Sequence, residues 1–403
     1  MDVDAAVTVL VEAMQPVADF EDLPLSQVAN RILSKNIDAA VALPPFDNSA
    51  MDGYALRVGD LPASGVGCLP QSQYITTGSW PEAALTAGTV ARIFTGGAIP
   101  SGADAVVMQE KCTVTAGGVV IPAGVPVGAN IRWQGEDIAV GSLGLVAGTL
   151  LRPQEIGLLA ALGVARVPVY RRLRVGLFST GDELVAPGEA LAPGKIYDSN
   201  RVQIAALAAQ MGAEVIDLGR VPDNLEATLS ALRNGAEKAD LLLSTGGVSV
   251  GDADHVKQAL QQLGTIDFWR VAIKPGKPLA FGRVAGVPFI GLPGNPASAL
   301  VTFCILVAPA LRRLQGRQQA LSPLWLPVPV GFSRHRVNEQ RREYLRVRLE
   351  SHRGETVAIA HNYQGSSSLV SMAWASGLME VVAGRRFEVG EYLPYLPFSE
   401  FLA

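Results

Sequence analysis

The chain has 403 residues, of which 49% are hydrophobic and 17% are charged, so it can form about two to four domains with sizeable cores. The formal net charge of −4 is mild and predicts neither a nucleic-acid partner nor a membrane-surface partner. No run approaches the roughly 18 apolar residues of a membrane span, and acidic residues stand at the N-terminus where a signal peptide needs basic ones.

The first 170 residues are predicted to begin with two helices and to continue as β structure. The first helix lies at the N-terminus and the second at about 28–33. Short alternating runs rich in Gly and Pro predict strands and loops over 44–137. A hairpin-like stretch follows at 143–151, and a short helix with Pro at its start covers 153–162. The apolar residues expected to face the core are Ala5, Ala6, Val9, Leu10 and Ala13 in the first helix and Val28, Ile32 and Leu33 in the second.

From Leu173 to about residue 315, strands and helices alternate at the spacing of a doubly wound parallel sheet. The run Leu241–Leu243 is wholly apolar, as a strand buried on both faces requires. The first helix of this region is expected to be capped by Ser199 or Asn200. Strands are predicted at about 174–178, 214–218, 241–243, 268–273 and 289–292, and helices at about 199–212, 224–238, 254–264 and 297–315.

After Pro323 the chain becomes β-rich again, which predicts a small separate β domain. The segment 342–350 alternates apolar residues with arginines, and 380–398 contains two strand-like runs. The surrounding stretch 334–353 has seven arginines and three glutamates. Such a basic stretch fits a solvated strand face, and it also fits an anion site shared with the neighbouring domain.

Gly-rich and polar loops follow the strands of the α/β region. Ligands of a parallel sheet bind beyond the carboxyl ends of its strands. We therefore expect these loops to form one site, whose chemistry suits a cytosolic enzyme acting on a phosphorylated ligand. The loops are 179–183, Asp223, 244–251, 274–278 and 293–296.

The residue types in these loops suit an anion. Glycines let backbone N–H groups approach a phosphate or oxyanion, although a tight turn explains the same pattern. Lys274 and Lys277 stand beside prolines and are either fixed positive charges or solvated surface lysines. The residues expected to form the anion-binding loop are Ser244, Gly246, Gly247, Ser249 and Gly251.

Four carboxylates precede or follow the same strands: Asp182, Glu183, Asp223 and Asp254. Hard oxygen ligands suit a divalent cation that bridges to phosphate. Helix N-capping is the alternative for Asp223 and Asp254. The four histidines form neither a zinc pattern nor a triad with serine, so serine nucleophile chemistry is excluded.

The β-rich second region holds a dense polar segment at 44–55, with further polar groups at 95–97 and 135–137, which ordinary turn chemistry also explains. Three scattered cysteines, Cys68, Cys112 and Cys304, have no metal spacing and are expected to be buried thiols in a reducing compartment. These features predict a cytoplasmic protein.

Eight sequence motifs occur in order along the chain: PPFDNSAMDGYA, TGGAIPSGADAVVMQE, GEDI, FSTGDEL, IYDSN, GGVSVGDAD, AIKPGKP and GLPGNPASAL. In this order they resemble the molybdopterin molybdenumtransferase family, which includes the C-terminal part of gephyrin. The resemblance implies insertion of molybdate into adenylylated molybdopterin with release of AMP and with Mg²⁺ as cofactor. It also implies transient contact with a molybdopterin adenylyltransferase and with recipient molybdoenzymes.

The resemblance further implies an elongated homodimer of four-domain subunits. The domains are an N-terminal dimerisation domain (1–41 and 138–170), a β-rich domain (42–137), a molybdopterin-binding α/β domain (171–317) and a C-terminal small β-barrel (323–403). The cleft would lie between the α/β domain of one subunit and the second domain of its partner.

The resemblance assigns roles to residues on both sides of that cleft. The implied catalytic residues are Asp52, Asp137, Glu183, Asp223 and Asp254, of which Glu183, Asp223 and Asp254 also hold the metal. The implied substrate-binding residues outside the Gly-rich loop are Thr95, Lys274, Lys277, Pro293, Pro296, Arg346 and Ser366. One departure is the pair Trp133-Gln134, which stands where the family frequently has arginine.

Three other functions are less consistent with the chain. A molybdopterin adenylyltransferase normally has one such α/β domain alone, and a pyrophosphatase-type relative lacks the DNSAMDGYA segment. A molybdopterin-binding scaffold of this family has an extra N-terminal domain and a long linker, neither of which this sequence contains.

Overall fold

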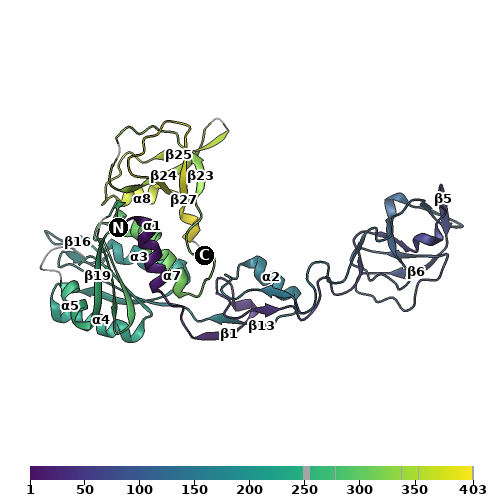
Figure 1. Ribbon diagram of the computed structural model, residues 1–403, viewed down its shortest axis with the longest axis horizontal. Coiled ribbons are helices and arrows are strands. Elements are labelled where there is room, and N and C mark those ends of the chain that lie inside the picture. Colours follow the sequence, from purple (N-terminus) through teal and green to yellow (C-terminus); the bar gives the residue numbers. More distant parts are fainter. Residues whose placement is uncertain (248–254, 277, 337, 353, 402–403) are drawn as a thin grey trace. The chain divides into compact units, whose positions relative to one another are not determined.

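The computed structural model describes residues 1–247, 255–276, 278–336, 338–352 and 354–401. The chain divides into two compact units (Figure 1). The large unit comprises Met1–Lys35, Ala147–Arg152 and Pro168–Ala403, and the small unit comprises Asn36–Val146 and Pro153–Val167.

A six-stranded mixed sheet forms the centre of the large unit and confirms the expected α/β fold. Its four parallel strands, in spatial order, are β17 (Glu214–Val221), β14 (Arg174–Thr180), β18 (Leu241–Thr245) and β22 (Val287–Leu292). Beyond β22, the strands β21 (Pro278–Val284) and β19 (Gly264–Arg270) continue the sheet antiparallel. The antiparallel strand β21 was not expected from the sequence.

Helices cover both faces of this sheet because alternate residues of each strand face opposite ways. Leu241 and Leu243 belong to the core shared with one helical layer, whereas Leu242 belongs to the other core. The first layer contains α3 (Ser199–Gln210) and the continuous helix made of α6 (Pro296–Thr302), the π-helical η4 (Phe303–Val307) and α7 (Ala308–Leu314); the second contains α4 (Leu225–Lys238) and α5 (His255–Leu263).

The helix Pro296–Leu314 is long and apolar enough to cross a membrane, but 94% of its most apolar window is buried inside the protein. A core helix of a globular domain has this property. Asp198 caps α3 by accepting a hydrogen bond from the amide of Arg201, so neither Ser199 nor Asn200 is the cap. Asn224 caps α4 as expected.

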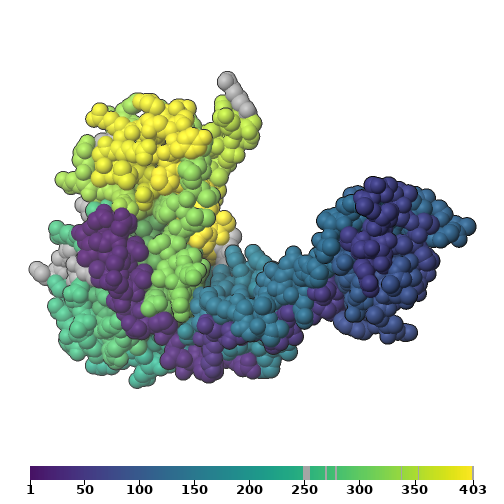
Figure 2. Space-filling model, turned by 45° about the vertical axis from the view of Figure 1, so that its right-hand side comes forward, coloured from purple at the N-terminus to yellow at the C-terminus, as the bar shows by residue number. Residues whose placement is uncertain are grey.

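The N-terminal helix α1 (Val3–Ala13) packs against η4 and α7, and Figure 2 shows this purple segment at the surface of the large unit. Its buried face consists of Val3, Ala6, Leu10 and Met14, whereas Ala5 and Val9, which we expected to be buried, are exposed.

The expected second helix does not form. Only the short 3-10 turn η1 (Leu25–Gln27) is helical, and Asn30 has a positive φ of 58°. Ile32 and Leu33 instead form β-bridges with Leu150 and Val169. The nearby strands are β1 (Phe20–Pro24) and β13 (Arg166–Tyr170).

A partly buried ion pair joins the beginnings of two strands of the central sheet. Arg171 donates two hydrogen bonds, of 2.6 and 2.7 Å, to the carboxylate of Asp240. Burial alone would raise the pKa of Asp240, but the hydrogen bonds from Arg171 and from the Arg174 amide outweigh it and hold that pKa below its ordinary value.

The C-terminal part of the large unit is a second six-stranded sheet with its own core, which includes Val330, Val347 and Phe387. Its opposite side contributes Tyr344, Leu378 and Leu396 to the core of the α/β region. The elements are β20 (Ile273–Lys274), β23 (Leu326–Pro329), β24 (Arg342–His352), β25 (Glu355–Ala360), α8 (Leu369–Trp374), β26 (Gly377–Val381), β27 (Tyr392–Pro397) and η5 (Phe398–Phe401).

The small unit is rich in short strands, as predicted, and has two apolar clusters. A four-stranded sheet contains β6 (Gln71–Ile75), β7 (Val90–Ile93), β4 (Gly53–Leu56) and β8 (Ala105–Met108), and a three-stranded sheet contains β5 (Val66–Leu69), β10 (Gly118–Pro122) and β9 (Thr113–Thr115). The strand pairs are β3 (Asn48–Ser49) with β11 (Ile131–Arg132), and β2 (Ile37–Asp38) with β12 (Leu143–Leu145).

Two local predictions in the first half need correction. The stretch 143–151 is not a hairpin, because β12 pairs with β2 and Leu150 bridges to Ile32. Cys68 is exposed and Cys112 is partly buried, so only Cys304 is the buried thiol expected of all three. The short helix α2 (Pro153–Ala161) ends before Gly163, which has a positive φ of 76°, as predicted.

Candidate active site

The loops after β14, β18 and β22 meet at the carboxyl edge of the central sheet. Gly246 donates its amide to the carbonyl of Leu292, and Asn200 donates its side-chain amide to the carbonyl of Gly294 at 2.7 Å. Ser244 is fully buried, and its hydroxyl has no partner among the described residues. The structure therefore brings Ser244, Gly246 and Pro293 to one place, as expected from strand order.

Gly246 and Gly247 allow a close approach between two of these loops. Both have positive φ angles, of 85° and 65°. A Cβ at Gly246 would lie 2.8 Å from the carbonyl oxygen of Thr180, and one at Gly247 would lie 2.6 Å from its hydroxyl. Any larger side chain would push these loops apart. Ser249, Gly251 and Asp254, which were also expected here, lie outside the described residues.

The exposed carboxylates Asp182, Glu183 and Asp223 follow β14 and β17. The amide of Asp223 donates to the Asp182 carboxylate at 3.3 Å. Asp223 does not cap α4, because Asn224 does so. These side chains are hard oxygen donors of the kind that Mg²⁺ prefers. Among the described residues, however, no group of three or more His, Cys, Asp and Glu side chains is arranged to hold a metal ion.

Lys274 lies at the carboxyl edge of the central sheet, as expected, because the connection between β19 and β21 joins the two strands where Arg270 pairs with Pro278. It lies on β20, which pairs in parallel with β24 of the C-terminal sheet, so that Lys274 stands opposite Glu343. Its ammonium nitrogen is 2.5 Å from Glu343 Oε1. Arg334 forms a second ion pair with the same carboxylate, whose side chain is only 4% exposed. Lys277 lies outside the described residues.

The loop that carries Lys274 also contacts helix α6 through Gly276. A Cβ at Gly276 would lie 3.3 Å from Thr302 Oγ1 and 3.9 Å from Ser298 Cβ, both on α6. The loop that carries Lys274 therefore lies against the helix that begins at Pro296.

Arg346 and Ser366 reach the same helix from the C-terminal sheet. The amide of Ala297, in the first turn of α6, donates to the carbonyl of Ser366 at 3.0 Å. Arg346 is 1% exposed and donates to the carbonyl of Gly365 at 2.9 Å and to Ser371 Oγ at 3.3 Å. Helix α6 thus contacts the Ser366 loop, to which Arg346 donates, at its first turn and the Lys274 loop at Ser298 and Thr302.

The charge of Arg346 is held in a dry environment. Burial lowers its pKa to about 10, and the negative charge of Glu343 opposes this shift. The hydrogen bonds of its guanidinium group go to a carbonyl and a hydroxyl, both neutral groups. A buried cation with neutral acceptors is suited to an anionic ligand. The basic stretch 334–353 is therefore not simply a solvated strand face.

In the small unit, Asp52 and Thr95 form one group. Asp52 Oδ1 accepts hydrogen bonds from the amide and the hydroxyl of Thr95, each at 2.8 Å. These two hydrogen bonds lower the pKa of Asp52. The structure thus brings together two residues, 43 positions apart, that the sequence assigned to one site.

Asp137 lines a pocket of about 460 Å³ in the same unit, with Asn48 and Arg132 among its other walls. Arg132 was not among the predicted site residues. The arginine that is frequent in the family was expected at Trp133-Gln134, where this sequence has none. It lies directly before that pair and supplies a positive charge to the pocket. The pairing of Arg132 with Asn48 between β11 and β3 places Arg132 in the pocket wall, and no local sequence motif predicts that pairing.

Comparison with known proteins gives matches along most of the chain. Residues 1–163 match the MoeA N-terminal region (domains I and II), 176–313 match a probable molybdopterin-binding domain, and 333–398 match the MoeA C-terminal region (domain IV). The fold and its loops therefore define a multidomain molybdopterin-binding type of protein.

Relatives of known name specify the family. A molybdopterin molybdenumtransferase of Haemophilus influenzae is 43% identical over 324 residues, which are 79% of each chain. One of Nostoc sp. is 38% identical over 388 residues, 94% of this chain and 88% of that protein. A MoeA protein structure from Pyrococcus horikoshii aligns with a TM-score of 0.85 and 27% identity over 99% of this chain and 100% of that one. The chain belongs to the molybdopterin molybdenumtransferase (MoeA) family, which confirms the resemblance read from its motifs.

Proposed function

We propose that this chain transfers molybdate to adenylylated molybdopterin and releases AMP, as the last step of molybdenum cofactor synthesis. Relatives at up to 43% identity are named molybdopterin molybdenumtransferase, which supports the activity.

The observation that carries the proposal is that α6 contacts two loops, the Ser366 loop to which Arg346 donates and the loop of Lys274. Molybdate is a tetrahedral dianion and needs cations and N–H or O–H donors around it. Arg346 offers a fixed fork of donors, and Lys274 offers a point charge held by Glu343. Together they neutralise the anion where water is partly excluded, which strengthens the attraction.

The Gly-rich loop is assigned to the phosphate groups of the adenylylated substrate. Gly246 and Gly247 leave their backbone open to a close ligand, and the buried hydroxyl of Ser244 adds a donor. Pro293 and Pro296 shape the facing loop. With both substrates bound, thiolate and molybdate are brought together, and this positioning lowers the cost of the reaction. Each Mo–S bond forms as one molybdate oxygen takes up two protons and leaves as water, with the ammonium of Lys274 proposed as one proton donor. Water cleaves the phosphate bond to the nucleotide, which releases AMP.

Mg²⁺ is the proposed cofactor, with Glu183, Asp223 and Asp254 as its ligands. Glu183 and Asp223 are exposed carboxylates beside the same loops. Bound there, Mg²⁺ would neutralise phosphate charge. Removing the ion with a chelator is expected to abolish AMP release and leave molybdate binding intact, because the proposed molybdate site uses no metal ligand.

The active form is proposed to be a cytoplasmic homodimer. Asp52, Thr95 and Asp137 lie in the small unit and are assigned to the site of the partner subunit. The three cysteines of the chain are free, which suits a reducing compartment. Molybdopterin adenylyltransferase and recipient molybdoenzymes are the proposed transient partners, since one supplies the substrate and the others take the product.

The test is molybdate-dependent AMP release from adenylylated molybdopterin by three variants. Lys274→Ala and Arg346→Lys are expected to raise the molybdate concentration needed for half-maximal rate by about tenfold or more, as the loss of a charged hydrogen bond predicts. Arg348→Ala is the matched control, because Arg348 lies on the same strand but pairs with Glu350 at the surface. Equal molybdate dependence in all three variants would contradict the proposed site.

A further inference from the structure

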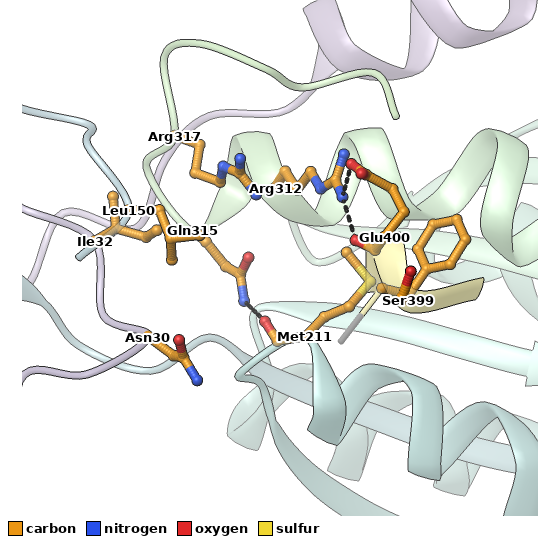
Figure 3. A pocket seen from close by; sticks show the side chains of 10 residues that line it. Asn30, Ile32, Leu150, Met211, Arg312, Gln315, Arg317, Ser399 and Glu400 are labelled. Carbon is orange, nitrogen blue, oxygen red and sulfur yellow. Dashed lines mark hydrogen bonds and ion pairs between the residues drawn. The ribbon is translucent and has the colours of Figure 1, made fainter. Parts of the chain in front are cut away.

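A second basic pocket lies in the large unit, apart from every residue assigned to the reaction. It has a volume of about 220 Å³ and is formed by the end of α7, the C-terminal turn η5 and the segments around Asn30 and Leu150 (Figure 3). Its polar lining includes Arg312, Arg317 and Glu400. None of its lining residues belongs to the candidate active site.

One of the two arginines is already neutralised. Arg312 is 3% exposed, and its Nη2 donates to Glu400 at 2.9 Å (Oε1) and 3.0 Å (carbonyl). Its Nη1 donates to the carbonyl of Leu321 at 3.2 Å, whereas its Nε has no partner among the described residues. Arg312 and Glu400 therefore form a partly buried ion pair that holds the C-terminal turn against α7.

The second arginine adds a positive charge that this pair does not balance. Arg317 is partly buried, and Figure 3 draws no bond from it to the other lining residues. Glu400 is the sole carboxylate among the described residues that line the pocket. Burial first, and then repulsion by Arg312 and Arg152, lowers the pKa of Arg317 to about 10, although the negative charge of Glu400 opposes this.

Neutral polar groups surround Arg317. Gln315 donates its side-chain amide to the carbonyl of Met211 at 2.6 Å, which fixes that side chain in the wall. Asn30 and Ser399 also line the pocket, and both can donate hydrogen bonds. The amide of Arg317 donates to the carbonyl of Arg312 at 3.1 Å, which caps the end of α7 and reduces the negative potential there.

We propose that this pocket binds a small tetrahedral oxyanion of the phosphate and sulfate class between Arg317 and Arg312. Two guanidinium groups beside one carboxylate leave one unit of positive charge, and a guanidinium fork matches two oxygens of such an anion. The size supports a small ligand, because pockets for larger organic ligands have volumes of about 300 Å³ or more. Bound there, the anion joins α7, η5 and the Asn30 segment, and so stabilises the fold of the large unit.

Thermal unfolding of the full chain tests the proposal, with sodium phosphate titrated against sodium chloride at equal ionic strength. Wild-type protein is expected to show a saturable rise in Tm. Arg317→Met is expected to need about tenfold more phosphate for the same rise. Arg313→Met is the matched control, because Arg313 precedes the pocket on the same helix and does not line it. An unchanged phosphate dependence in Arg317→Met would overturn the proposal.

Further measurements separate this site from the active site. The phosphate-dependent rise in Tm is expected to persist in Lys274→Ala, and its loss there would assign the effect to the active site. AMP is expected to give no rise in Tm that depends on Arg317. A rise in Tm that depends on Arg317 and occurs with AMP but not with phosphate would reject a small oxyanion as the ligand of this pocket. Crystals of wild-type protein soaked in selenate need no variant. An anomalous peak beside Arg317 is expected, and its absence at saturating selenate would contradict the proposal.

Discussion

Glu343→Gln is expected to damage both stability and molybdate binding. Glu343 is 4% exposed and balances two cations, Lys274 at 2.5 Å and Arg334, whose side chains are 42% and 23% exposed. Breaking a fully buried pair by removing one partner costs about 3–5 kcal/mol. Since both cations keep some contact with water, we expect a smaller loss, of about 1–3 kcal/mol, in the free energy of unfolding.

Loss of this carboxylate also releases the ammonium of Lys274. A displacement of about 1 Å in a positioning group can cost about a hundredfold in rate, so we expect molybdate-dependent AMP release to fall by about tenfold or more. Urea unfolding measures the stability, and initial rates at varied molybdate measure the activity. Glu350→Gln is the matched control, because Glu350 pairs with Arg348 on the same strand at the surface and should change stability by about 0.5 kcal/mol or less. Unchanged stability and molybdate dependence in Glu343→Gln would refute the reasoning.

Three more predictions concern the dimer, acid stability and the Gly-rich loop. Mixing Asp137→Asn and Lys274→Ala chains, assayed at a molybdate concentration too low for Lys274→Ala alone to turn over, should restore about a quarter of the wild-type rate if each site uses two subunits, and none if it lies within one chain. Asp240→Asn should lose about 1–3 kcal/mol of stability at pH 7. Because folding lowers the pKa of Asp240, the stability that its carboxylate contributes is present above about pH 4 and is lost as the pH falls through the folded pKa. The unfolding curves of variant and wild type should therefore converge in acid. Gly247→Ala should destabilise the protein by about 1–3 kcal/mol in chemical denaturation. Gly219→Ala is the control and should cost less, because Gly219 has a similar positive φ but nothing within 4 Å of the new Cβ. Equal losses would show that the close contact at Gly247 does not matter.

The sequence predicted the α/β region well because its signals are local. The apolar strand Leu241–Thr245 and the cap at Asn224 are determined by neighbouring residues. Strand order then places the loops at one edge, so the meeting of Ser244, Gly246 and Pro293 was predictable.

The errors arose where distant segments decide the structure. The spacing of Val28 and Ile32 fits a helix, but the left-handed Asn30 interrupts it, and Ile32 pairs with Leu150, more than a hundred positions away. Lys274 lies at the expected edge of the central sheet, but its additional pairing with Glu343 of the C-terminal sheet was not expected. The role of Glu343 was not predicted, because one partner, Lys274, is distant in sequence and the other, Arg334, is one of several arginines in the stretch 334–353. An acidic residue within this basic stretch was an available signal.

The most direct test of the account is the stoichiometry of AMP release by the purified chain. With adenylylated molybdopterin and Mg²⁺, adding molybdate should release one AMP for each molybdenum atom that becomes bound to the pterin product. AMP release that does not depend on molybdate, or molybdenum incorporation without AMP release, would contradict the proposed function.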